Sequence, residues 1–157
     1  MANIGFIGLG IMGAPMAANL VKGGHTLYTH TLGDTPPTLI DAGATPCANG
    51  AEVARRGDII ITMVPDTPHV EAALFGENGV AEGLSKGKTV LDMSSISPVA
   101  TKQFARRIND LGCEYLDAPV SGGEVGAKAA SLTIMVGGNE AAFNTVKPLL
   151  DLMGKNI

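Results

Sequence analysis

One stretch near the start of the chain, GFIGLGIMGAPMAANL (Gly5–Leu20), constrains the fold more than any other. An apolar segment at Ile4–Ile7 precedes the spacing G-x-G-x-x-G at Gly8–Gly13, and an Ala-rich helical pattern follows it to Lys22. This order predicts a strand, a tight turn and a helix, which is the setting in which a glycine motif binds a dinucleotide. The chain contains 21 glycines, so a role in packing alone is the alternative.

Each glycine of the motif has a physical task if the turn holds a dinucleotide. Gly8 allows the tight turn, Gly10 lets the backbone approach a pyrophosphate, and Gly13 permits close packing of helix on strand. The helix start also presents unpaired N–H groups and a positive dipole end to the phosphates. We therefore predict that the cofactor contacts Gly8, Leu9, Gly10, Ile11, Met12 and Gly13.

Strand-like and helix-like segments alternate along the whole chain. The predicted strands are Ile4–Ile7, Thr26–Thr31, Ile59–Val64, Thr89–Asp92, Glu114–Leu116 and Leu132–Val136. The predicted helices are Met12–Lys22, Pro37–Ala42, Ala51–Arg56, Pro68–Phe75, Pro98–Leu111 and Glu140–Met153. The run DIIITMV (Asp58–Val64) is continuously apolar, as in a strand buried on both faces. We expect one α/β domain over residues 1–157 with a doubly wound, mostly parallel sheet.

Composition excludes several classes of function. The net charge of −4 and the aromatic content of 4% argue against nucleic-acid binding. No basic leader and no apolar run of about 18 residues is present, so we expect a cytoplasmic protein without a membrane segment. Cys47 and Cys113 lie far apart with no metal-ligand spacing, so we expect two free thiols and no metal.

The end of the second predicted strand, YTHTLGD (Tyr28–Asp34), leaves the cofactor type open. A ribose-binding acid or a phosphate-binding Arg is expected about 20 residues after the glycines, where this chain has Thr31 or Leu32. Asp34 lies nearby, either as a ribose ligand or as a solvated turn residue. We predict that Thr31 contacts the cofactor, which is NAD or NADP.

Two further loops follow strands whose carboxyl ends face the predicted site. MVPDTPHV contains Met63, Val64 and Pro65, which would line the cofactor, although the segment could also be only a rigid helix start. In DMSSISP, Ser97 suits a helix N-cap, and Ser95 is the better candidate beside a nicotinamide ring.

The segment LDAPVSGGEVGA (Leu116–Ala127) offers a second kind of site. Consecutive N–H groups at Ser121, Gly122 and Gly123 could form an anion-binding nest for a small carboxylate substrate. A Gly-rich crossover loop is the plainer alternative.

Together these stretches resemble the β-hydroxyacid dehydrogenase family, the relatives of 3-hydroxyisobutyrate and 6-phosphogluconate dehydrogenases. MVPDTPHVEAALFGENG and DMSSISP are most similar to the branch that reduces tartronate semialdehyde (2-hydroxy-3-oxopropanoate) to glycerate. The resemblance implies hydride transfer between NAD(P)H and a small 3-oxo or 3-hydroxy acid held by Ser121, Gly122 and Gly123. 3-Hydroxyisobutyrate is the alternative substrate, and a non-catalytic dinucleotide-binding module is the alternative function.

The resemblance also implies a part that this chain lacks. In the family a proton-relay lysine lies after the dinucleotide-binding domain, in a helical domain that completes the cleft and a homo-oligomer. The lysines of this chain match no such position: Lys22, Lys86, Lys88, Lys102, Lys128, Lys147 and Lys155. We therefore expect no catalytic residue within the chain, a lysine beyond Ile157, and little activity without it, because positioned acid catalysis contributes about 10²–10⁴-fold.

Overall fold

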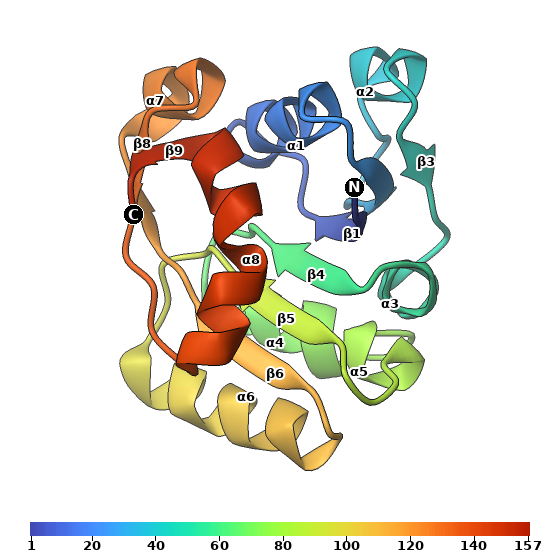
Figure 1. Ribbon diagram of the computed structural model, residues 1–157. Coiled ribbons are helices and arrows are strands. Elements are labelled where there is room, and N and C mark those ends of the chain that lie inside the picture. The colour runs from blue at the N-terminus through green and yellow to red at the C-terminus, as the bar shows by residue number, and fades with distance from the viewer.

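The computed structural model describes all residues, 1–157, and is built around a six-stranded parallel sheet (Figure 1). The strands are β1 (Asn3–Ile7), β2 (Thr26–His30), β3 (Thr45–Pro46), β4 (Ile59–Thr62), β5 (Thr89–Asp92) and β6 (Glu114–Asp117). Their order across the sheet is β3-β2-β1-β4-β5-β6, and every neighbouring pair is parallel. The order reverses between β1 and β4, which confirms the predicted doubly wound fold.

Helices cover both faces of this sheet. They are α1 (Gly13–Lys22), α2 (Pro37–Asp41), α3 (Gly50–Arg56), α4 (Thr67–Phe75), α5 (Val80–Gly83), α6 (Pro98–Asp110), α7 (Gly123–Ala129) and α8 (Glu140–Met153). Figure 1 shows α8 crossing in front of the sheet, with α4, α5 and α6 on the other side. All six predicted helices are present within one residue at each end.

The continuous apolar run of β4 is explained by two separate cores. Ile59 and Ile61 belong to the cluster that contains Met16 of α1 and Leu150 of α8. Ile60 belongs to the opposite cluster, which is formed with helices α3, α4 and α6. Successive side chains of a strand point to opposite faces, so a strand covered on both faces needs apolar residues throughout.

Side-chain caps fix the starts of the two longest helices. The Ser97 hydroxyl accepts from the backbone N–H of Ala100 at 3.4 Å, and the Asn139 side chain accepts from that of Ala142 at 3.1 Å. Both satisfy N–H groups that a helix start leaves unpaired. The helix boundaries were therefore readable from local sequence.

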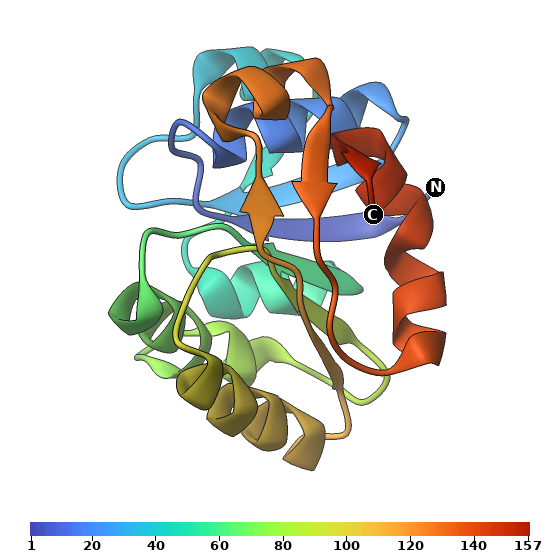
Figure 2. The same cartoon turned by 90° about the vertical axis from the view of Figure 1, so that its left-hand side faces the viewer.

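The C-terminal third differs from the prediction. The strand expected at Leu132–Val136 is β8 (Leu132–Ile134), and it lies in a separate sheet with β7 (Val120–Ser121) and β9 (Gly154–Asn156). Figure 2 shows β7 and β8 side by side, and their pairing is antiparallel. Leu132 and Ile134 are buried while Thr133 is half-buried, and this alternation is typical of a strand covered on one face only.

Short elements were missed altogether. The sequence analysis placed no element at β3, α5 or α7, and it treated the Gly-rich segment after Ser121 as a loop. β3 and α5 have two and four residues, too few for a hydrophobic period to show, and α7 consists largely of Gly and Ala. None of the helices combines the length and the apolarity needed to span a bilayer.

Candidate functional site

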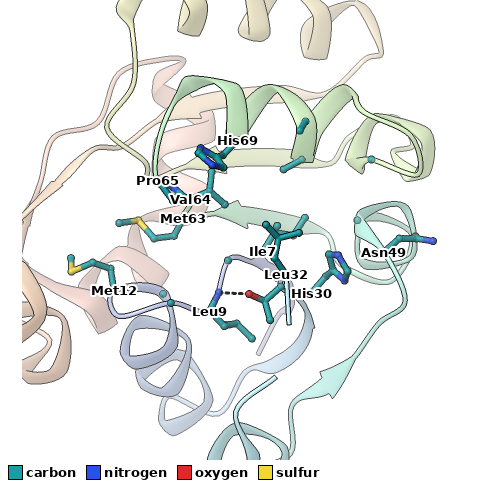
Figure 3. A pocket seen from close by; sticks show the side chains of 18 of the residues that line it. Ile7, Leu9, Met12, His30, Leu32, Asn49, Met63, Val64, Pro65 and His69 are labelled. Atoms are coloured by element: carbon teal, nitrogen blue, oxygen red, sulfur yellow. Dashed lines mark hydrogen bonds between the residues drawn. The ribbon is translucent and has the colours of Figure 1, made fainter. Parts of the chain in front are cut away.

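A cavity of about 770 Å³ opens at the carboxyl ends of β1, β2 and β4. Ligand sites of doubly wound sheets lie at this edge, where the strand order reverses. The cavity is lined by all of the predicted cofactor residues, namely Gly8, Leu9, Gly10, Ile11, Met12, Gly13, Thr31, Met63, Val64, Pro65 and Ser95. Figure 3 shows Met12 and Met63 toward one end of it and His30 and Asn49 toward the other.

The glycine turn at its floor has little room for side chains. Gly8 has a φ of +98°, and a Cβ there would overlap the carbonyl oxygen of Met63. A Cβ on Gly13 would overlap the carbonyl oxygen of Gly8, so the helix start packs directly on the turn. By contrast, a Cβ on Gly10 would meet nothing within 4 Å, so Gly10 faces open space.

The same turn carries unpaired hydrogen-bond donors. The Gly8 N–H donates to the His30 carbonyl at 3.0 Å, and the Leu9 N–H donates to the Thr31 hydroxyl at 3.2 Å, the bond drawn in Figure 3. The next four N–H groups have no partner in the chain: Gly10, Ile11, Met12 and Gly13. Pro15, in the first turn of α1, has no backbone N–H and so leaves no further donor unpaired. Free N–H groups at the start of a ten-residue helix are the donors that anion-binding sites use.

A buried carboxylate holds the loops on the opposite wall. Asp92, at the end of β5, has no exposed surface. Its Oδ1 accepts from the Thr62 hydroxyl at 2.9 Å and from the Ser94 N–H at 3.1 Å, and its Oδ2 accepts from the Tyr115 hydroxyl at 3.4 Å. The network therefore joins the ends of β4, β5 and β6.

Ser94 extends this network into the cavity wall. Its hydroxyl accepts from the Val64 N–H at 2.9 Å, which ties the Met63–Pro65 loop to the loop that carries Ser95. Ser94 is buried, whereas Ser95 is exposed and lines the cavity. Of these two hydroxyls, only that of Ser95 faces the cavity, while Ser97, the other serine considered from the sequence, caps α6.

Burial raises the pKa of two groups in this network. It raises the pKa of the Asp92 carboxyl above its ordinary value of 3.8, against the opposing effect of the hydrogen bonds from Ser94, Thr62 and Tyr115. Burial and the neighbouring Asp92 also raise the pKa of the Tyr115 hydroxyl, which stays a neutral donor.

Sequence reasoning missed the other half of the lining. The additional residues are Ile7, His30, Leu32, Asn49, Gly50, His69, Ala72, Ala73, Glu77, Asn78 and Gly79. Most come from the start of α3 and from α4 and the turn after it, which sequence reasoning did not place beside the glycine turn. His30 was within reach, because it directly precedes the predicted Thr31.

Ser121, Gly122 and Gly123 do not line the cavity. Ser121 ends β7, Gly122 caps α7 with a φ of +134°, and Gly123 is the first residue of that helix. Helix α7 is fastened to α1 by the Asn19 amide, which donates to the Ala127 carbonyl at 2.9 Å. Lys128 pairs with Glu124 at 2.9 Å on the exposed side of α7, so it is a surface charge.

Comparison with known proteins agrees with this geometry. Residues 3–157 match the family described as the NAD binding domain of 6-phosphogluconate dehydrogenase. The chain belongs to this family. The NAD-binding domain also confirms the resemblance to β-hydroxyacid dehydrogenases that the sequence motifs indicated.

Two curated relatives and one solved structure define the similarity. The domain is 58% identical over 154 residues to 2-hydroxy-3-oxopropionate reductase of Escherichia coli K12, covering 98% of this chain and 53% of that protein. It is 45% identical over 156 residues to the mitochondrial 3-hydroxyisobutyrate dehydrogenase of Drosophila melanogaster, covering 99% and 48%. A structure of Mycobacterium tuberculosis 3-hydroxyisobutyrate dehydrogenase with L-serine superposes with a TM-score of 0.90 at 34% identity, covering 100% of this chain and 53% of that one. The chain thus spans about half the length of these relatives.

Proposed function

We propose that the cavity holds NAD(H) or NADP(H) and that the complete protein is an oxidoreductase acting on a small hydroxy acid. The free N–H groups of Gly10–Gly13 carry this proposal, because they give a pyrophosphate four donors and a helix dipole. The cavity volume also lies within the range of ordinary ligand sites, roughly 300–1,000 Å³. The site therefore fits a dinucleotide.

The order of the strands gives the dinucleotide its direction. With the pyrophosphate on the glycine turn, the adenosine half extends toward the end of β2 and the nicotinamide half toward β4 and β5. Met63, Val64, Pro65 and Ser95 then line the nicotinamide side. The Asp92 network would hold these loops in place before the cofactor arrives.

Three chemical parts are needed to reduce a carbonyl group. The bound dinucleotide supplies the hydride, and Ser121, Gly122 and Gly123 would hold the carboxylate of the substrate. The acid that protonates the developing alkoxide is the third part. No lysine lines the cavity, so we assign that role to a lysine in a helical domain beyond Ile157.

We place 2-hydroxy-3-oxopropanoate, which is reduced to glycerate, first among the substrates. The 58% identity to 2-hydroxy-3-oxopropionate reductase supports this choice over 3-hydroxyisobutyrate, for which the identity is 45%. A clamp that reads a carboxylate alone does not separate the two acids. Comparing kcat/KM of the full-length gene product on both substrates, with each coenzyme, decides between them.

Binding of the coenzyme to the 157-residue chain tests the first part of the proposal directly. NADH fluorescence should rise on titration, and ADP-ribose should displace it. Absence of binding for both ligands at millimolar concentration would overturn the proposed site. Binding without turnover by the full-length protein on any small hydroxy acid would favour a non-catalytic module.

A further inference from the structure

The carboxyl end of β2 contains neither an acid nor an Arg or Lys. A dinucleotide site usually recognises the adenosine ribose there, with a carboxylate for the 2′-hydroxyl or an Arg for a 2′-phosphate. Thr31 already accepts a hydrogen bond from the Leu9 N–H, and Leu32 is 91% exposed and apolar. Asp34, the acid considered from the sequence, is exposed and does not line the cavity. The usual residues for this task are therefore absent from the cavity wall.

His30, the last residue of β2, supplies a polar atom in their place. Its half-buried ring lines the cavity, at the end opposite Met12 and Met63 in Figure 3. The Nδ1 atom lies 3.3 Å from the carbonyl oxygen of Cys47. A carbonyl oxygen only accepts, so Nδ1 carries the proton, and in the neutral ring Nε2 is then left as an acceptor.

The charged residues around the cavity also favour a ribose hydroxyl over a 2′-phosphate. No Lys or Arg lines it, and its one carboxylate is Glu77, in the turn after α4. A 2′-phosphate would bring about two negative charges to a wall that offers no cation. A ribose hydroxyl, by contrast, can donate a hydrogen bond to the Nε2 atom of His30.

We infer that His30 is the specificity-determining residue of the adenosine subsite. Its Nε2 accepts from the adenosine ribose hydroxyl, and the site consequently prefers NAD(H) to NADP(H). The inference rests on the proposed function, since it assumes that a dinucleotide occupies the cavity. It assigns to a histidine the role that an acidic residue has in the usual fingerprint.

Binding titrations with NADH, NADPH and NADH lacking the adenosine 2′-hydroxyl test this assignment. The wild-type chain should bind NADH about fivefold more tightly than the 2′-deoxy analogue, the effect of one net hydrogen bond, and NADPH more weakly than NADH. His30→Asn keeps a donor for the Cys47 carbonyl but has no atom at the Nε2 position. This variant should bind NADH and the 2′-deoxy analogue equally. His30→Gln, which places an amide oxygen near that position, should restore the discrimination.

Two further variants separate recognition from folding. His30→Phe keeps the ring without its nitrogens and should also lose the discrimination, so the test stands if His30→Asn does not fold. His25→Asn makes the same substitution before the opposite end of β2, outside the cavity, and should discriminate as the wild type does.

The outcomes distinguish the two proposals. If the wild-type chain binds neither NADH nor ADP-ribose, the proposed function fails and this inference with it. If NADH binds but both His30→Asn and His30→Phe still favour it over the 2′-deoxy analogue, His30 has no such role. Tighter wild-type binding of NADPH than of NADH would likewise overturn the inference.

Discussion

The Asp92 carboxylate accepts a hydrogen bond from the Thr62 hydroxyl at 2.9 Å, within the protein interior. The two residues pair across neighbouring strands at the carboxyl ends of β4 and β5. Since Met63 directly after β4 and Ser95 three residues after β5 line the cavity, this one contact fixes the relative position of two loops that would hold the cofactor. The Asp92 carboxyl is also a buried ionisable group, so its contribution to the free energy of unfolding can be measured by changing the pH.

Asp92 should make the stability of the chain depend on pH. Its pKa is raised by burial, so between 3.8 and the raised native value the folded state binds more protons than the unfolded state. The contribution of the neutral carboxyl to stability is therefore full below pH 3.8 and is lost as the pH rises through the native pKa. Urea unfolding at several pH values should show this decline in the wild type and its absence in Asp92→Asn. The same decline in both proteins would contradict the assignment, and Asp110→Asn removes an exposed carboxylate as the control.

Two glycine variants should separate folding from binding. Gly13→Ala places a methyl group against the Gly8 carbonyl and should lower the free energy of unfolding by about 1–3 kcal/mol. Gly10→Ala meets no neighbouring atom and should unfold like the wild type, within about 0.5 kcal/mol.

Their NADH affinities complete that comparison. Gly10→Ala should weaken NADH binding by about tenfold or more, because its methyl group displaces phosphate bonds worth roughly 1.5–3 kcal/mol each. Denaturant unfolding and fluorescence titration on the same samples measure both effects. Unchanged NADH affinity in Gly10→Ala would remove the glycine turn from the phosphate site.

The neighbouring serines should behave in opposite ways. Ser94→Ala leaves the Val64 N–H without its acceptor and should cost about 1–3 kcal/mol of unfolding free energy. Ser95→Ala removes an exposed hydroxyl and should leave stability unchanged. Its effect should appear as weaker binding of NADH with unchanged binding of ADP-ribose, which lacks the nicotinamide ring. Equal losses for both ligands would place Ser95 away from the nicotinamide side.

Cys47 should react slowly with thiol reagents at neutral pH. Burial and the nearby Glu52 carboxylate raise its pKa to about 11. At pH 8 the thiolate fraction is then about one in a thousand, and the rate should rise roughly tenfold per pH unit up to pH 10. A Cys113→Ser variant isolates Cys47, since the serine hydroxyl can replace the thiol that donates to the Ser85 carbonyl. A rate that levels off near pH 9 would show an ordinary thiol.

The sequence predicted those parts of the molecule in which local signals and the fold agree. The strand at Ile4–Ile7, the glycine turn and α1 were recognisable because each glycine answers a steric need that the structure confirms at Gly8 and Gly13. The Asp92 network was not predictable. Thr62, Asp92 and Tyr115 come from three strands that only the sheet brings together. A single Asp at the end of a strand forms no sequence motif that would predict its hydrogen-bond partners.

The candidate site was predictable on one side only. Its glycine wall and the loops after β4 and β5 follow from the rule that ligands bind at the carboxyl ends of the strands. The wall formed by Asn49, Ala72 and Glu77 depends on how α3 and α4 pack, which their short and unremarkable sequences do not specify. At β2 the sequence analysis named Thr31, which lines the cavity, but not the preceding His30, which lines it as well.

The bond between Asn19 and Ala127 has a consequence for how this chain can vary in length. Helix α1 begins at the glycine turn and, six positions later, holds α7, whose first residue is Gly123. Inserting one residue between Gly13 and Asn19 would rotate the amide by about 100° around the helix axis and detach α7. The number of residues from Gly13 to Asn19 therefore fixes the distance between the glycine turn, which would bind the cofactor, and the turn before α7, which would bind the substrate. The length of this segment is constrained even where no ligand touches it.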